Sequence, residues 1–147
     1  ELRYKRLVLA AKIIERQNIQ NILLMRERGE LIDEYLPHKS MDCMHINFPD
    51  PWSKKARRKH RILSAEFLSK MHPHFRSKGE LRFKTDHLEY FETVTDILQD
   101  LKTYTIIEHT TDLHRSEYNE NNILTEFEML FKSKENPPIG FLRAEVL

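Results

Sequence analysis

The chain has 147 residues, of which 39% are hydrophobic, so it can bury the core of one domain spanning residues 1–147. No segment approaches the roughly 18 consecutive apolar residues that a membrane-spanning helix needs, so we expect no membrane association. The single cysteine, Cys43, excludes an internal disulfide and a zinc site of clustered cysteines. These features together predict a cytoplasmic protein.

Opposite charges are concentrated in two successive segments, although the net charge of the chain is only +1. Residues 54–84 contain 11 Lys and Arg against two Glu, which gives a local net charge of +9. Residues 86–128 contain 11 Asp and Glu against one Lys and one Arg, a local net charge of −9. We expect one face that binds a polyanion and another that is kept away from it.

The first half of the chain predicts two helices and two strands. Apolar residues at helical spacing predict a helix over residues 3–16, and the apolar run 21–25 predicts a buried strand. A short helix is expected over residues 30–36, where Pro37 ends it. A second buried strand, residues 41–48, runs into the turn Pro49-Asp50-Pro51.

The second half predicts three helices and three strands. The expected helices are 64–75 with Ser64 as the N-cap, a helix from an Asp86 cap to about Leu101, and 125–132. The expected strands are 80–84, 104–109 and 139–146, and residues 114–122 read as a polar loop.

Strands that alternate with helices predict an α/β fold with a mostly parallel sheet covered on both faces. We expect the last strand to return as an antiparallel edge. A fold of this class usually begins with a strand and a Gly-rich turn, whereas this chain begins with a helix and has only three glycines. The sequence therefore predicts that Glu1 follows further strands of a longer protein.

Carboxylates follow the predicted strands at their C-terminal ends, where ligands bind in open α/β sheets. They are Glu27, Asp50 and Asp86, together with Glu1 if a strand precedes it. Each acid has a structural alternative as a helix cap or a solvated loop acid, and for Asp86 capping is about as good an explanation as binding. Together they indicate a site that handles hydroxyls or positive charge.

The segment FPDPW, residues 48–52, is the most specific local feature. Two prolines restrict the backbone around Asp50, so the direction of its carboxylate is set by the chain itself. Phe48 and Trp52 offer flat surfaces on which a base could stack. The structural alternative is a rigid loop with a core aromatic residue.

The basic run that follows holds six Lys and Arg and one His within residues 53–61. Such runs are often solvated surfaces or localisation signals. This one lies between a strand end and a helix start, on the expected ligand side of the sheet. That position favours sequence-independent contacts to phosphate.

Three stretches together resemble one known family. They are NFPDPWSKKARRKHRI (47–62), ELRFKTDHLEYFE (80–92) and NNILTEFEMLFKSKENPPIGFLRAEV (121–146). Over essentially its whole length the chain resembles the bacterial tRNA (guanine-N7-)-methyltransferase family. The resemblance implies a Rossmann-like class I methyltransferase fold, a three-layer α/β sandwich. It also implies S-adenosylmethionine as the methyl donor, S-adenosylhomocysteine as the product, no metal, and tRNA as the partner.

The resemblance further implies roles for individual residues. Glu1 matches the acid that binds the cofactor ribose, and Glu27 matches the acid beside the adenine, where the family commonly has Asp. Asp50 matches the residue assigned to the cofactor site and to catalysis. Matches to substrate-binding positions are Lys54, Asp86, Thr125, Glu126, Phe127 and Glu128. The tRNA backbone is then expected to contact Lys54, Lys55, Arg57, Arg58, Lys59 and Arg61.

The chemistry of methyl transfer to guanine N7 agrees with this set of residues. N7 is a hydrogen-bond acceptor with an in-plane lone pair, so it needs no deprotonation. Positive charge develops on the purine during transfer, and a fixed carboxylate such as Asp50 can stabilise that charge and position the base. Neither a nucleophilic side chain nor a metal ion is required, and the eight His residues form no metal-binding pattern.

Two alternatives remain open from the sequence. An amino-group methyltransferase of the N6-adenine type carries an Asn/Asp-Pro-Pro-aromatic motif, which Asp50-Pro51-Trp52 resembles except for its missing second proline. A non-catalytic RNA-binding α/β domain is the other, because the chain contains no Gly-rich cofactor loop. The sequence does not decide between a monomer and a homodimer.

Overall fold

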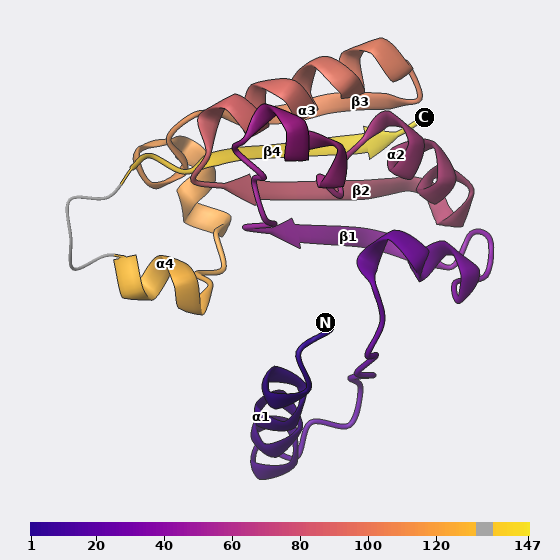
Figure 1. Cartoon of the computed structure of the whole chain (residues 1–147), viewed down its shortest axis with the longest axis vertical. Helices are drawn as coiled ribbons and strands as arrows, with labels where there is room; N and C mark the ends of the chain where they lie inside the picture. Colours follow the sequence, from indigo (N-terminus) through magenta and orange to yellow (C-terminus); the bar gives the residue numbers. More distant parts are fainter. Residues whose placement is uncertain (132–136) are drawn as a thin grey trace. The chain divides into compact units, whose positions relative to one another are not determined.

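The computed structural model describes residues 1–131 and 137–147, which form two compact units, residues 1–37 and 38–147. Figure 1 shows the chain with its helices and strands labelled. The larger unit contains a four-stranded sheet, and the smaller one contains a helix followed by an extended segment.

The smaller unit is built on helix α1 (Tyr4–Arg16), which matches the predicted helix. The prediction of a buried strand at residues 21–25 is wrong. These residues form no strand, and the Leu23 side chain is 87% exposed. No strand within the described ranges pairs with this segment, so its backbone forms no inter-strand hydrogen bonds there. A 3-10 helix, Gly29–Glu34, stands where the short helix was expected.

The sheet has the strand order β1-β2-β4-β3. The strands are β1 (Met41–Asn47), β2 (Phe75–Thr85), β3 (Tyr104–Thr110) and β4 (Gly140–Val146). β1 and β2 are parallel, whereas β4 is antiparallel to both β2 and β3. The antiparallel direction of the last strand is thus confirmed, but its expected place at the edge is wrong. β4 lies between β2 and β3 and forms hydrogen bonds with both of them. β3 is therefore the edge strand on that side of the sheet.

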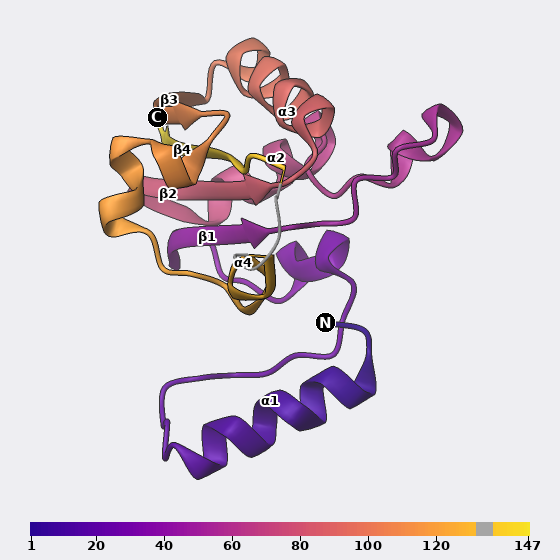
Figure 2. The same ribbon diagram turned by 90° about the vertical axis from the view of Figure 1, so that its left-hand side faces the viewer.

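Two helices, α2 (Ala65–Met71) and α3 (Leu88–Leu101), cover one face of the sheet (Figure 2). The core lies between them and the strands, where Phe83, Phe91 and Leu142 are fully buried. The predicted cap of α2 is confirmed, because the Ser64 hydroxyl accepts a hydrogen bond from Phe67 N. The predicted Asp86 cap of α3 is wrong. His87 is the N-cap, and its Nδ1 accepts from Tyr90 N at 3.2 Å.

The opposite face of the sheet carries polar and charged side chains. β1 was expected to be buried, yet Met44 is its only buried residue, because alternate side chains of β1 point to this polar face. Beyond β3 the chain forms two 3-10 turns, Leu113–Arg115 and Glu117–Asn121, and then helix α4 (Glu126–Phe131). The expected end of that helix at Lys132 lies outside the described residues.

Candidate functional site

The FPDPW loop leaves β1 beside the C-terminal end of β2. Phe48 N donates to Lys84 O at 2.8 Å, so the pairing of the two strands continues into the loop. Phe48 and Trp52, on either side of Asp50, have positive φ angles of 49° and 43°. Such angles are rare for aromatic residues, and strained backbone of this kind is concentrated at functional sites.

Asp50, the central residue of this loop, is exposed. No ion pair or hydrogen bond joins its carboxylate to another residue of the described chain. Asp86, at the end of β2, is half-buried and precedes the first turn of α3. The two predicted acids therefore follow neighbouring parallel strands, as the ligand rule for open α/β sheets requires.

Arg61 differs from the rest of the basic run because it is buried, with its side chain only 5% exposed. Its Nε donates to Pro51 O at 2.8 Å, and its two terminal nitrogens donate to the Glu89 carboxylate. The guanidinium also stacks over the Tyr90 ring at 4.5 Å from the centroid. The expectation that Arg61 contacts a tRNA backbone does not fit this burial, since its donors are used inside the protein.

Glu89, in the first turn of α3, is the partner of two residues of the basic run. It binds Arg61 on one side and Arg58, at 3.0 Å, on the other. The hydrogen bond from Arg61 is the main cause that holds the pKa of Glu89 below its usual range. Glu89 is therefore ionised at neutral pH and ties the basic run to the helix that follows Asp86.

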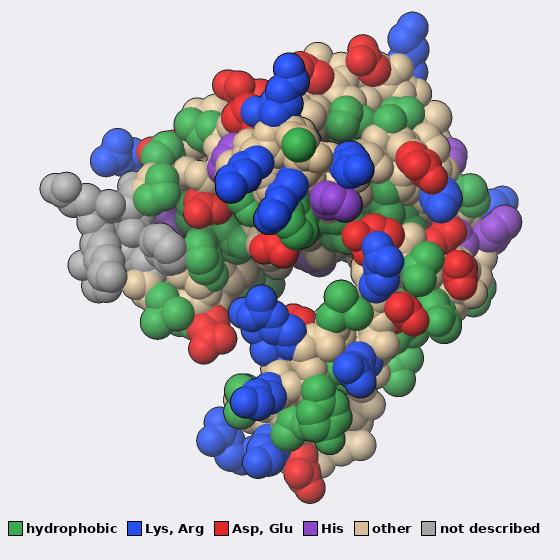
Figure 3. Space-filling model, in the orientation of Figure 1, with side chains coloured by type: hydrophobic (Ala, Val, Ile, Leu, Met, Phe, Trp, Pro, Cys, Tyr) green, Lys and Arg blue, Asp and Glu red, His purple; other side chains and the backbone are tan. Residues whose placement is uncertain are grey.

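The exposed part of the basic run forms a 3-10 turn, Lys55–His60, that projects away from the sheet (Figure 2). On the face of the larger unit seen in Figure 3, several Lys and Arg side chains are exposed over this part of the chain. Four of them are exposed and have no ion pair within the described ranges: Lys54, Lys55, Arg57 and Lys59. The Trp52 ring lies beside this turn, and its centroid is 5.4 Å from the ring centroid of His60.

The TEFE motif begins α4 with a capping box. Thr125 Oγ1 accepts from Glu128 N at 3.2 Å, and Thr125 N donates to Glu128 Oε2 at 2.8 Å. The Glu128 side chain is fully buried, although the residue was expected in a substrate-binding position. Thr125 and Phe127 are partly exposed and Glu126 is exposed.

Glu128 lies at the centre of a polar network. Its Oε2 accepts from Lys84 Nζ at 3.1 Å, and its Oε1 lies 3.1 Å from both His114 Nε2 and Asn122 Nδ2. Lys84 Nζ also donates to Asn122 Oδ1 and to Ile123 O. Although burial acts to raise it, hydrogen bonds from the backbone N–H of Thr125 and from the side chains of Asn122 and Lys84 bring the pKa of Glu128 to about 2. The network fixes the start of α4 and the preceding loop to the end of β2.

Aromatic packing joins the FPDPW loop to the TEFE motif. The rings of Phe48 and Phe127 lie 4.4 Å apart between centroids. Phe48 also packs against a small apolar cluster of Leu113, Ile139 and Phe141. Two motifs that the sequence places far apart, one predicted to be catalytic and one predicted to bind substrate, are thus neighbours.

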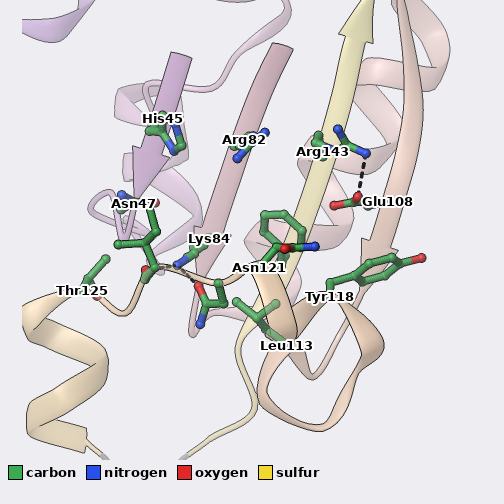
Figure 4. A pocket seen from close by; sticks show the side chains of 13 residues that line it. His45, Asn47, Arg82, Lys84, Glu108, Leu113, Tyr118, Asn121, Thr125 and Arg143 are labelled. Atoms are coloured by element: carbon green, nitrogen blue, oxygen red, sulfur yellow. Dashed lines mark hydrogen bonds and ion pairs between the residues drawn. The ribbon is translucent and has the colours of Figure 1, made fainter. Parts of the chain in front are cut away.

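A cavity of about 490 Å³ opens on the polar face of the sheet. His45, Arg82 and Arg143 project into it from three adjacent strands, and Glu108 faces Arg143 from the fourth (Figure 4). Arg143 is held by Glu108 at 2.6 Å and by Glu80 at 2.8 Å. Lys84, Asn122 and Thr125 of the Glu128 network also line this cavity. Its charges are therefore largely paired within the protein.

Glu1 and Glu27, the predicted cofactor acids, belong to the smaller unit. Glu1 N donates to Met25 O at 3.4 Å and Arg26 Nε to Leu2 O at 3.2 Å, so the segments that carry the two acids are adjacent. The backbone N–H of Arg3 lowers the pKa of Glu1, and that of Arg28 lowers the pKa of Glu27. Both carboxylates are ionised acceptors, which is the chemistry that sugar hydroxyls and an exocyclic amine require.

Four residues that organise the site were not predicted: Glu89, Lys84, His114 and Asn122. The only sequence signal for Glu89 is that it is an acidic residue three positions after Asp86, a predicted ligand, and this signal is weak. In the parts of the chain that the structure describes, no group of three or more His, Cys, Asp or Glu is placed to hold a metal ion. Among the same residues, none of the helices combines the length and apolar character of a membrane span.

Comparison with known proteins gives one family for most of the chain. The family model described as "Putative methyltransferase" matches residues 1–139. A bifunctional glycosyltransferase/methyltransferase of Fusobacterium nucleatum is 43% identical over 142 residues, 97% of this chain and 22% of that protein. A tRNA (guanine-N(7)-)-methyltransferase of Mycoplasma pneumoniae is 38% identical over 115 residues, 78% of this chain and 55% of that protein.

These relatives confirm the resemblance predicted from the three sequence stretches, while the chain spans between about a fifth and about half of their lengths. Solved structures agree on the fold. An rRNA methylase of Streptococcus thermophilus has a TM-score of 0.63 at 16% identity, over 100% of this chain and 70% of that one. A "putative methyltransferase" of Streptococcus mutans in complex with SAH has a TM-score of 0.62 at 13% identity, over 100% and 73%. The predicted Rossmann-like methyltransferase fold is therefore confirmed. The prediction of a mostly parallel sheet is wrong for the described strands, because only one of the three strand pairs is parallel.

Proposed function

This chain belongs to the methyltransferase family whose model spans residues 1–139, and from this premise we propose that the protein is a tRNA (guanine-N7-)-methyltransferase. Its reaction moves a methyl group from S-adenosylmethionine to N7 of a guanine in the tRNA variable loop, in the cytoplasm. The two compact units are then parts of one methyltransferase domain, because the family model runs across both of them.

The observation that carries this proposal is the contact between the FPDPW loop and the TEFE motif beside an exposed basic turn. The Phe48–Phe127 contact brings Asp50 near the residues that match substrate-binding positions. The adjoining Lys and Arg side chains are exposed and available for phosphate. A projecting basic surface of this kind fits a polyanionic substrate.

The cofactor assignment rests on three carboxylates. Glu1 would accept from the ribose hydroxyls of S-adenosylmethionine, and Glu27 would lie beside its adenine. Asp50, in the larger unit, is the third acid assigned to cofactor binding. The ionised state of Glu1 and Glu27 and the adjacency of the segments that carry them fit these roles. When bound, the cofactor supplies an electrophilic methyl group on a sulfonium.

Asp50 then acts electrostatically and by positioning. Guanine N7 needs no base, so the carboxylate has no proton to remove. A fixed negative charge beside the purine stabilises the positive charge that develops there, and holding the base in line with the methyl group supplies much of the acceleration. The strained backbone on both sides of Asp50 supports a loop of defined conformation around this residue.

Binding of tRNA is divided between two groups of residues. Contacts to the target nucleotide come from Lys54, Asp86, Thr125, Glu126 and Phe127, and Glu128 supports this group by holding the TEFE motif in place. Contacts to the phosphate backbone come from Lys54, Lys55, Arg57, Lys59 and, in addition to its bond with Glu89, Arg58. Acidic residues elsewhere limit wrong docking by repulsion.

The test is analysis of the product formed by the intact protein. Bulk unmodified tRNA is incubated with S-adenosylmethionine, digested to nucleosides and examined by mass spectrometry. N7-methylguanosine is the expected product, and a tRNA whose variable-loop guanine is replaced by adenine should accept no methyl group. Formation of N6-methyladenosine would favour the amino-group methyltransferase, and tRNA binding with no methylated product would favour the non-catalytic domain.

A further inference from the structure

The buried pair of Arg61 and Glu89 joins the two loops that carry Asp50 and Asp86. Arg61 binds the carbonyl of Pro51, the residue after Asp50, at 2.8 Å. Glu89 lies in the first turn of the helix that follows Asp86. The Arg61–Glu89 ion pair therefore connects the end of β1 to the end of β2 through side chains, in addition to the hydrogen bonds of the sheet.

The geometry of this connection is specific to an arginine. The guanidinium uses Nε for the Pro51 carbonyl and both terminal nitrogens for the Glu89 carboxylate, while its flat face covers Tyr90. A lysine ammonium would keep the charge but could not reach both loops with fixed directions. With the Arg61 side chain 5% exposed, little water is present to replace a lost bond.

A second contact extends the connection to the basic turn. Glu89 Oε1 binds Arg58 at 3.0 Å, and Arg58 is partly exposed among the proposed phosphate contacts. Removing Glu89 would therefore release the FPDPW loop and the basic turn together. Tyr90 supports the same corner, because its hydroxyl accepts from Leu63 N at 3.0 Å.

We propose that Arg61 and Glu89 are positioning residues that hold Asp50 in its working direction, rather than residues that contact tRNA. This role rests on the proposed function, because it concerns the same carboxylate. Arg61 acts on the backbone of the FPDPW loop, and Glu89 fixes Arg61 to α3. Misplacement of a reacting group by about 1 Å can slow a reaction about a hundredfold, so a loosened loop should be visible in the rate.

The test compares Arg61→Met, Arg61→Lys and Glu89→Gln with Glu92→Gln, an exposed control on the same helix. We measure the single-turnover rate with saturating cofactor and tRNA, the Kd for tRNA, and acrylamide quenching of Trp52, the only tryptophan of the chain. Arg61→Met and Glu89→Gln should lower the rate about tenfold or more and raise Trp52 quenching. For Arg61→Met, the Kd for tRNA should stay within about threefold of the wild-type value.

The alternatives give different results. If Arg61 bound phosphate, Arg61→Met would weaken tRNA binding and reduce its salt dependence, with an unchanged saturated rate and unchanged Trp52 quenching, and the proposal would be overturned. If Arg61→Met does not fold, Arg61→Lys and Glu89→Gln must show the slower rate and greater quenching. If the wild-type protein methylates no tRNA, the proposed function fails, while Trp52 quenching still decides whether Arg61 holds the loop.

Discussion

The ring of Phe127 packs against the ring of Phe48, 4.4 Å away between centroids and tilted by 39°. This contact directly links the start of α4 to the loop that carries Asp50. Phe48, which makes this contact, directly follows β1 and has a positive φ of 49°. The ring packing therefore acts at a residue whose backbone is strained.

Loss of the Phe127 ring should slow methyl transfer. Phe127→Ala removes an aromatic contact worth about 0.5–1.5 kcal/mol beyond its buried area, and it frees the FPDPW loop on one side. We expect the single-turnover rate to fall about tenfold, with Phe127→Leu losing less. Met129→Ala, at a position 55% exposed on the same helix, is the control. Equal rates for Phe127→Ala and the control would contradict the link.

Asp50→Asn should reduce methyl transfer to N7 by about a hundredfold or more, because one electrostatic contact to the transition state is lost. The asparagine keeps the size and the hydrogen-bonding oxygen but removes the negative charge beside the purine. The measurement is the single-turnover rate at saturating tRNA. Asp96→Asn, at an exposed position of α3, should retain the wild-type rate. Full turnover by Asp50→Asn would rule out the electrostatic role.

Glu128 should make the protein less stable in acid. Its pKa of about 2 in the folded state lies below the reference of 4.5, so its stabilisation is complete above pH 4.5 and is lost as the pH falls toward 2. A shift of this size corresponds to about 3 kcal/mol. Urea unfolding at pH 7 and pH 3 should show a smaller pH difference for Glu128→Gln than for the wild type. Glu126→Gln should behave as the wild type does, and identical pH differences for all three proteins would exclude the effect.

Glu128→Gln should also lower stability at neutral pH. Lys84 would keep its bonds to Asn122 and Ile123 but lose its ionic partner inside the protein. Removal of one partner from a buried pair costs about 3–5 kcal/mol. Urea unfolding at pH 7 measures this difference directly, with Glu126→Gln again as the control. A change below about 0.5 kcal/mol would mean that the Glu128 network adds little to folding.

Charge removal from the basic turn should weaken tRNA binding and reduce its dependence on salt. Lys55→Ala and Arg57→Ala together should lower the slope of log Kd against log salt by about one per side chain that contacts phosphate. The saturated single-turnover rate should change little. Lys70→Ala, on α2, removes one exposed charge outside the turn and should leave the slope unchanged. An unchanged slope for the double variant would argue against phosphate contact.

Much of the fold was predictable because the spacing of apolar residues along each helix matches the side chains that the structure buries. The apolar spacing of α3 predicts an inward face of Tyr90, Phe91, Val94, Ile97 and Leu98. All of them are buried except Ile97, which is partly exposed. The apolar run at residues 21–25 misled because a buried strand needs partners that periodicity does not report. The position of β4 likewise depends on which strands have free hydrogen-bonding edges, a property of the whole sheet.

The location of the candidate site could be predicted from the sequence. Which of its charged residues are buried and which are exposed could not. Arg61 and Arg57 belong to the same basic run, yet the first is buried and the second is exposed. The contacts that distinguish Arg61 include Glu89 and Tyr90 on α3, which are distant from it in the sequence. Similarly, the sequence of the TEFE motif is compatible with a capping box or with a set of substrate ligands. In the structure Glu128 forms the capping box with Thr125.

The place of β4 between β2 and β3 bears on how the protein is made. A ribosome releases residues 104–110 well before residues 140–146, so β3 emerges without the strand that pairs with it. During that interval β2 and β3 each expose an unpaired edge on which another nascent chain could add. The hydrogen bonding between β2 and β3 is bridged only when residues 140–146 have left the exit tunnel, so arrest before that point would leave an aggregation-prone intermediate.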